Sequence, residues 1–144
     1  MKRIAIYSCY IPYNEDSEKN NRKKLEDLRL KMGEQDSVEV IGIFEESLPA
    51  KTQLEDRPEL LKLLEMAKNN MLNEIILPRM GQLTTSYIVA DDIFEKFKNE
   101  KVCVKCLEDG ICNRGKMHAG TLNYIRLLPK FEDENAYLKE ITMG

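Results

Sequence analysis

The sequence RIAIYSCYIP, residues 3–12, decides the fold. Its residues 4–7 form an apolar run without a helical period, which is typical of a strand buried on both faces in the middle of a parallel sheet. Residues 8–14 then form the turn that leaves the carboxyl end of this strand. Ligands and reactive groups usually lie at that end in open α/β sheets, so we expect the functional site there.

Strand and helix patterns alternate along the rest of the chain. Strands are expected at 38–44, 74–78 and 102–106, and amphipathic helices at 16–32, after residue 56 and around 90–97. Alternation of this kind predicts an α/β fold, in which a mostly parallel sheet of four or five strands is flanked by helices. Residues 1–144 are interpreted as one domain, which is large enough to bury a core without metal or disulfide support.

Residues that start and stop helices mark several of these boundaries. Asp16 or Ser17 can cap the first helix, and Gly33 follows its last apolar residue. Asp56 is expected to cap the second helix, with Pro58 in the first turn, where a missing N–H costs nothing.

The last segment, from about residue 117, has the pattern of a long amphipathic helix. Its apolar residues recur mainly at three- and seven-residue spacings: Leu122, Ile125, Leu128, Phe131, Leu138 and Ile141. This stripe is longer than a lone surface helix needs, so a helix-to-helix interface with a partner is favoured over an intramolecular core. Pro129 must kink or split the helix.

The composition argues against several classes of protein. The formal net charge is -3 and the pI about 5.4, so no global positive field attracts nucleic acid or anionic lipid. No apolar run has the length of a signal-peptide core or a membrane span, which makes a cytoplasmic protein without membrane contact the expectation. Without a secretory signal, the four cysteines are expected to be thiols rather than disulfides, and no cofactor is expected.

Four motifs occur in order along the chain. Residues 4–11 are similar to the pattern hAhYxRhS, residues 57–68 to RPxLxxLLxxAK, residues 75–86 to IIVxKLDRLSRS, and residues 127–144 to LAEFERELIxERTxxG. Through these motifs the chain resembles the N-terminal catalytic domain of the serine site-specific DNA recombinases, the resolvase/invertase family. The resemblance implies a dimer formed through the C-terminal helix and a DNA-binding domain beyond that helix, so residues 1–144 alone should bind DNA weakly.

The positions that carry catalysis in this family hold other residues here. The resemblance implies that a serine attacks the scissile phosphate, supported by arginines and an acid. The corresponding residues are Ile11 for the serine, Cys9, Gln82 and Thr85 for arginines and Gly81 for the acid, with Arg57 retained and Lys68 expected beside it. An aliphatic side chain cannot act as a nucleophile. Phosphoryl transfer needs cations aimed at its transition state, and losing one such donor costs on the order of 3 kcal/mol.

We therefore expect a catalytically inactive recombinase domain that acts as an oligomerisation or regulatory module. Its partner is expected to be a second copy of the chain or another recombinase subunit. Two other functions are left open. A divergent active recombinase could use Ser8 or Cys9, but the serine needs a base and the cysteine a lowered pKa, and the only histidine lies far along the chain. A small-molecule-binding module would have an apolar pocket beyond the strand ends, with Arg57 pointing into it. Arg57 could equally be an ion-pair partner of Asp56 or Glu59.

Two further clusters have a functional interpretation that we do not favour. Cys103 and Cys106, with Cys112 and His118 downstream, have a spacing that invites a zinc site. On a strand, however, residues three apart point to opposite faces, so we expect ordinary thiols and no metal. The basic run 22–24 is surrounded by acidic residues and is expected to be a solvated helix face.

Overall fold

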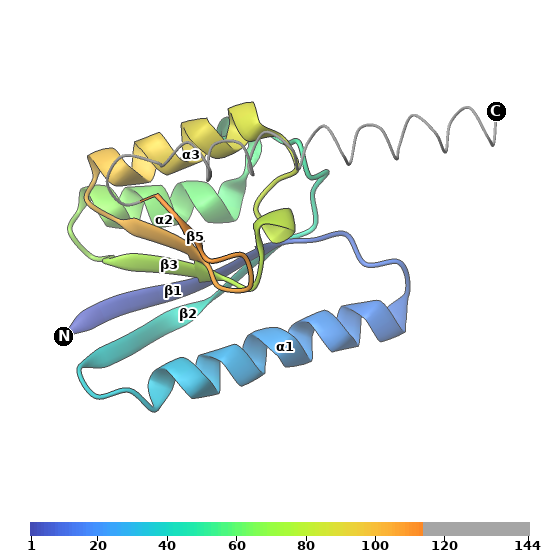
Figure 1. Ribbon diagram of the computed structural model, residues 1–144, viewed down its shortest axis with the longest axis horizontal. Coiled ribbons are helices and arrows are strands. Elements are labelled where there is room, and N and C mark those ends of the chain that lie inside the picture. The colour runs from blue at the N-terminus through green and yellow to red at the C-terminus, as the bar shows by residue number, and fades with distance from the viewer. Residues whose placement is uncertain (114–144) are drawn as a thin grey trace.

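The computed structural model of the chain describes residues 1–113, which form an α/β fold of three layers (Figure 1). Its sheet has five strands in the order β2–β1–β3–β4–β5. The strands are β1 (Lys2–Cys9), β2 (Val38–Glu46), β3 (Glu74–Leu77), β4 (Cys103–Cys106) and β5 (Ile111–Cys112). The first four pair in parallel, and β5 runs antiparallel to β4. The predicted α/β class with a mostly parallel sheet is confirmed.

Helices cover both faces of this sheet (Figure 1). α1 (Glu15–Gly33) lies on one face, and α2 (Pro58–Lys68) and α3 (Tyr87–Asn99) lie on the other. Two short 3-10 helices, η1 (Leu54–Asp56) and η2 (Met80–Gln82), lie in the loops before α2 and α3. The helix expected from about residue 117, with its apolar stripe and His118, lies outside the described residues. Within the described part of the chain, no helix is long and apolar enough to cross a membrane.

The central strand β1 contributes to a core on each side of the sheet. Its last six residues are all buried, which confirms the prediction of a strand covered on both faces. Tyr7 and Cys9 join the main hydrophobic core under α2 and α3. On the other side, Ile4 packs with Met32 of α1 in a smaller cluster. Because side chains alternate along a strand, Ser8 faces the same side as Ile4, toward α1.

A β-bulge in β2 determines where the end of this edge strand points. The register between β1 and β2 shifts between Ile4 and Ala5, so that Ile41 is an extra residue in β2. The next residue, Gly42, has a φ of 156°, a conformation that favours glycine. The extra residue reverses the alternation of side chains beyond it. It therefore turns Glu46 from the face under α1 to the face under α2.

The starts of the first two helices differ from the sequence-based predictions. α1 is capped by Asn14, and not by Asp16 or Ser17. The Asn14 side chain accepts a hydrogen bond from the Ser17 N–H at 2.9 Å, and the Ser17 hydroxyl accepts one from the Asn14 N–H at 3.1 Å. This capping box satisfies two N–H groups at once, which explains why the helix is capped by Asn14 and not by a later residue. Asp56 does not cap α2 either, because Arg57 occupies that position without a side-chain cap of its own.

Candidate functional site

Several segments converge on Arg57 at the carboxyl edge of the sheet. This side chain has no exposed surface. Its Nε donates to the carbonyl oxygen of Thr52 at 2.9 Å, and its Nη2 to that of Ala50 at 3.3 Å. Nη1 donates to the carbonyl oxygen of Leu83 and to the hydroxyl of Tyr7, the latter at 3.4 Å. Four such bonds nearly exhaust the five N–H donors of a guanidinium group, so Arg57 is committed to the protein interior.

Tyr7 links Arg57 to a buried carboxylate. The Tyr7 hydroxyl donates to Oε2 of Glu46 at 2.6 Å. Burial, followed by this hydrogen bond, raises the pKa of Tyr7 far above its ordinary value, so the phenol stays protonated and remains a donor. The three side chains therefore join β2, β1 and the start of α2 in one buried network, in which the charge of Arg57 offsets that of Glu46.

Glu46 also supplies the cap that α2 lacks. Its Oε1 accepts a hydrogen bond from the N–H of Glu59 at 2.8 Å, and its Oε2 one from the N–H of Leu60 at 3.3 Å. A carboxylate at this position satisfies free N–H groups and interacts favourably with the helix dipole. Sequence patterns did not reveal this role of Glu46, because the bulge directs its side chain. Gly42 within a strand pattern was the one available signal of that bulge.

The two alternative nucleophiles point to opposite faces of the sheet. Cys9 is 4% exposed on the α2 side, and its thiol donates to the carbonyl oxygen of Leu48 at 3.5 Å. Burial raises the pKa of Cys9, although Arg57 opposes this, so the reactive thiolate is disfavoured. Ser8 is 1% exposed on the α1 side, and its hydroxyl has no hydrogen-bond partner among the described residues. The side chains of Ser8 and Cys9 therefore do not contribute to one site.

Two of the remaining family positions lie away from Arg57 or in solvent. Ile11, in place of the family's serine, lies beyond the end of β1 and is 54% exposed. Lys68 is exposed at the last residue of α2, whereas Arg57 directly precedes the first. An α-helix of eleven residues is about 16 Å long, so Lys68 and Arg57 lie at opposite ends of α2. The expected ion-pair partners of Arg57, Asp56 and Glu59, are also not among its contacts, which are carbonyl oxygens and a hydroxyl.

The loop of residues 79–86 holds the other three family positions. Gln82 is buried, and its Nε2 donates to Oδ1 of Asn21 in α1 at 2.7 Å. Gly81 is exposed in η2, and Thr85 is half-buried. None of these three residues carries a charge. The acid of the family pattern is thus replaced by Gly81, and two of its arginines by Gln82 and Thr85.

The cysteines form no metal centre in the described part of the chain. Cys106 lies in the main core, 3.6 Å from the sulfur of Met80, and burial raises its pKa to about 12. Cys103, three residues earlier on β4, faces the other side of the sheet. No group of three or more His, Cys, Asp or Glu side chains among residues 1–113 could hold a metal. All four cysteines are free thiols, and His118 lies outside the described residues.

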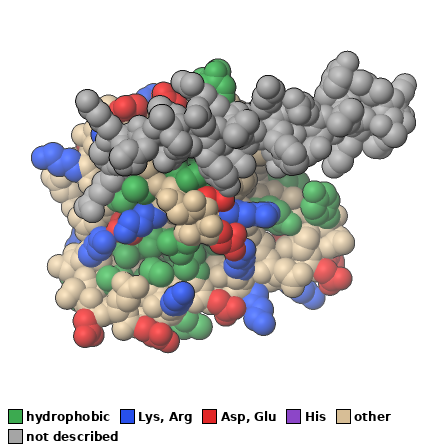
Figure 2. Space-filling model, viewed as in Figure 1, with side chains coloured by type: hydrophobic (Ala, Val, Ile, Leu, Met, Phe, Trp, Pro, Cys, Tyr) green, Lys and Arg blue, Asp and Glu red, His purple; other side chains and the backbone are tan. Residues whose placement is uncertain are grey.

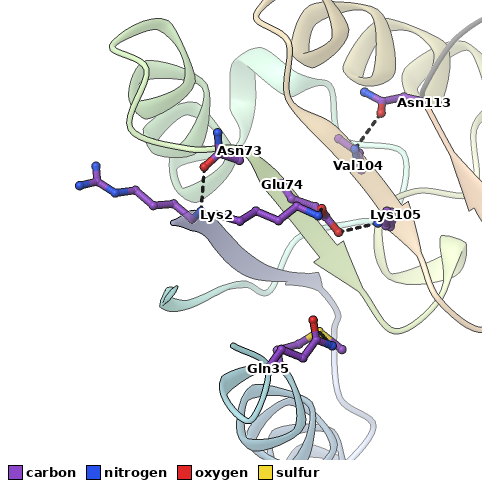
Figure 3. Close-up of polar contacts among 9 residues, drawn as sticks. Lys2, Gln35, Asn73, Glu74, Val104, Lys105 and Asn113 are labelled. Carbon is purple, nitrogen blue, oxygen red and sulfur yellow. Dashed lines mark hydrogen bonds and ion pairs between the residues drawn. The ribbon is translucent and has the colours of Figure 1, made fainter. Parts of the chain in front are cut away.

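A second polar cluster, on the α1 face of the sheet, joins three strands (Figure 3). Glu74 of β3 is buried, and its carboxylate lies 2.6 Å from Nζ of Lys2 and 3.0 Å from Nζ of Lys105. Burial alone would raise the pKa of Glu74, but the hydrogen bonds from the two lysines outweigh it and hold the pKa below its ordinary value. This arrangement ties β1, β3 and β4 together, and all three charges are used within it.

Two of the hollows on the surface are lined by residues of the described part of the chain. The larger, of about 320 Å³, lies between α1 and the turn after β4, where Leu28, Pro78 and Leu107 form an apolar floor. Figure 2 shows apolar side chains gathered at the centre of one face of the molecule, with lysine and arginine side chains around them. The second, of about 270 Å³, lies between η1 and α3. Arg57 is fully buried and lines neither of these two hollows.

Comparisons with known proteins agree with this fold. The family model described as "Resolvase, N terminal domain" matches residues 14–140. No curated protein matches the sequence. The N-terminal catalytic domain of TP901-1 integrase superposes with a TM-score of 0.60 at 16% identity, covering 96% of this chain and 99% of that one. A resolvase family site-specific recombinase from Streptococcus pneumoniae gives a TM-score of 0.61 at 12% identity, covering 99% and 95%.

A third solved structure, the C-terminal catalytic domain of ISC1926 TnpA, an IS607-like serine recombinase, gives a TM-score of 0.59 at 16% identity. It covers 73% of this chain and 68% of its own. At these identities the three structures demonstrate a shared fold, and the assignment to a family comes from the sequence match over residues 14–140.

Proposed function

This chain belongs to the resolvase family of serine site-specific recombinases, and from that premise we propose that it is a catalytically inactive member which acts as an oligomerisation or regulatory module. Its partner is a second copy of the chain or an active recombinase subunit. With a net charge of -3 and without cations at the family's phosphate-binding positions, residues 1–144 alone bind DNA weakly.

The observation that carries this proposal is the state of Arg57. It is the one arginine of the family pattern that this chain retains, and it is buried and hydrogen-bonded to three carbonyl oxygens and a tyrosine hydroxyl. Cations stabilise phosphoryl transfer only when they are aimed at the phosphate oxygens. A guanidinium with four protein partners has at most one donor left for a phosphate. Ile11, at the nucleophile position, has no group that could attack.

The competing proposal, a divergent active recombinase, has to use Ser8 or Cys9. Ser8 is enclosed beneath α1, and burial disfavours the thiolate of Cys9, so DNA would reach either group only after the local structure opened. The geometry therefore supports the inactive form over this one.

A covalent-adduct assay separates the two proposals. The full chain is incubated with nicked suicide duplexes that carry recombination sites, and any protein–DNA adduct is detected by mass shift on a denaturing gel. An active resolvase-family domain on its own site is the positive control. We expect no adduct with this chain. An adduct that disappears in Ser8→Ala or Cys9→Ala would overturn the proposal and establish the divergent enzyme.

The oligomerisation proposal is tested through the apolar stripe expected from Leu122 to Ile141. We expect the chain to form a dimer in analytical ultracentrifugation and Leu128→Asp to weaken it at least tenfold. Leu30→Asp is the matched control, because Leu30 lies on α1 and is 67% exposed. A monomer at high micromolar concentration, or equal effects of the two substitutions, would contradict the proposal.

A further inference from the structure

The kind of contact that holds α1 on the sheet changes along the helix. Near its C-terminal end, Met32 packs on Ile4 in an apolar cluster. α1 connects two parallel neighbouring strands and therefore runs antiparallel to β1 (Figure 1). Four residues of strand advance about 13 Å, which corresponds to about nine residues of helix. Ser8, four residues beyond Ile4 on the same face, therefore lies beneath the part of α1 between Asn21 and Leu25.

Gln82 reaches the same part of α1 from the other side. Its Nε2 donates to Oδ1 of Asn21 at 2.7 Å, which brings its amide group to the turn that covers Ser8. Ser8 is 1% exposed and Gln82 4% exposed. Ser8 Oγ and Gln82 Oε1 are the two buried side-chain polar atoms in residues 1–113 that have no hydrogen-bond partner. Buried polar atoms are almost always paired, so two unpaired atoms at one helix turn point to a shared ligand.

We propose that a single enclosed water molecule bridges Ser8 Oγ and Gln82 Oε1 and completes the attachment of α1 to β1. Gln82 Oε1 can only accept, so the water donates one hydrogen to it. Ser8 Oγ can either donate a hydrogen bond to the water or accept one from it. Asn21, whose Oδ1 is already used by Gln82, offers its Nδ2 as a third partner. Enclosed waters typically make about three hydrogen bonds to polar groups that otherwise lack a partner, which is the set available here.

The hollow of about 320 Å³ beside α1 lies next to the position of this water. Continuing the register between β1 and β3 by two residues places Ser8 next to Pro78, which lines the groove of about 320 Å³. Lys24, on the α1 side of that groove, lies one turn from Asn21. This part of α1 thus makes polar contacts close to solvent beside the fully buried Leu25. It should open locally before the apolar end around Met32 does.

A double-mutant cycle tests the bridge in the full chain. Urea unfolding is compared for wild type, Ser8→Ala, Gln82→Ala and the double variant. Each single change should raise the unfolding constant about fivefold or more, because it breaks one contact to the water. The double change should raise it at least threefold less than the product of the two, because the same water is lost once. Ser47→Ala, at an exposed serine after β2, should change it less than twofold.

Opposite results would overturn the bridge. A hydroxyl with no partner costs stability, so an unbridged Ser8 predicts that Ser8→Ala leaves the unfolding constant unchanged or lowers it. Independent effects that multiply would show that the two atoms share no ligand. If Gln82→Ala fails to fold, a high-resolution crystal structure of the wild type decides the question. A water within hydrogen-bond distance of both oxygens supports the proposal, and a direct bond between the two side chains or a dry contact refutes it.

Discussion

Replacing Arg57 with methionine should destabilise the domain by about 3–5 kcal/mol. Methionine preserves most of the length of the side chain but offers no hydrogen-bond donor. The carbonyl oxygens of Thr52 and Leu83 lose the donor that Arg57 gives them, and a buried acceptor left unpaired costs about 1–3 kcal/mol. The carbonyl oxygen of Ala50 loses less, because a threonine hydroxyl also donates to it at 2.6 Å.

The loss of charge should destabilise the domain in addition to the loss of these hydrogen bonds. Without the guanidinium, the buried carboxylate of Glu46 loses the cation that offsets it, and breaking such a buried pair typically costs about 3–5 kcal/mol. Tyr7 stands between the two groups and keeps its bond to Glu46, so part of this cost is avoided. Both effects arise from the same guanidinium and therefore do not add in full. The loss remains a large fraction of the 5–15 kcal/mol that is ordinary for a domain of about this size.

The measurement is urea unfolding followed by far-UV circular dichroism, because the chain contains no tryptophan. Arg29→Met, on the exposed surface of α1, is the matched control and should change stability by less than about 0.5 kcal/mol. Arg57→Lys should fall between wild type and Arg57→Met, because one ammonium cannot reach all four acceptors. A loss below about 1 kcal/mol for Arg57→Met would refute the reasoning. It would mean that the guanidinium is not held by these acceptors and is available to a phosphate.

Three further predictions concern other parts of the fold. Glu74→Gln should lower stability by about 1 kcal/mol at pH 7 and by nothing near pH 3. Because the pKa of Glu74 is lowered in the fold, the contribution of its carboxylate to stability is complete above the unfolded-state pKa of about 4.3. This contribution is lost as the pH falls through the folded-state pKa. Urea unfolding across this pH range measures the change. Cys112, which is half-buried, should react with a thiol reagent at pH 8 well before Cys9 and Cys106, whose pKa values burial raises; equal rates by mass spectrometry would contradict this. Asn113→Ala should lower the free energy of unfolding in urea by about 2–4 kcal/mol. The reason is that this buried side chain makes three hydrogen bonds to backbone groups of α3 and the β4 region. A decrease within experimental error would exclude that role.

Periodicity in the sequence was enough to place the main elements. The amphipathic helix expected around residues 90–97 is present, and its apolar stripe is buried: Ala90, Ile93, Phe94 and Phe97. The same holds for the strand that opens the chain, since an apolar run without helical period can be covered on both sides only inside a sheet. Such patterns lie within one helix or strand, and the spacing of the apolar residues is enough to predict which face of that element is buried. The short antiparallel strand β5 was not located, because two residues carry no period.

The contacts at the carboxyl edge could not be predicted, because they join residues far apart in the sequence. Glu46 caps α2 across 13 residues and reaches Tyr7 across 39. Its direction depends on one extra residue in β2, and a shift of one residue would place it on the opposite face. Gln82 and Asn21 meet across 61 residues. Local patterns therefore indicated which residues lie at this edge and gave no information on which of them touch.

The buried network also gives a physical reason why one arginine of the family pattern remains in this chain while others are replaced. A side chain whose main partner is a bound phosphate contributes little to the fold, so its loss leaves no buried group unpaired. Cys9 and Gln82, which stand at two arginine positions of the family pattern, make hydrogen bonds of their own with Leu48 and Asn21. Arg57 differs, because the fold itself supplies four acceptors for it, and removing it would leave buried carbonyl oxygens without donors. A role in stability is therefore sufficient to account for Arg57, as the proposal of a catalytically inactive domain requires.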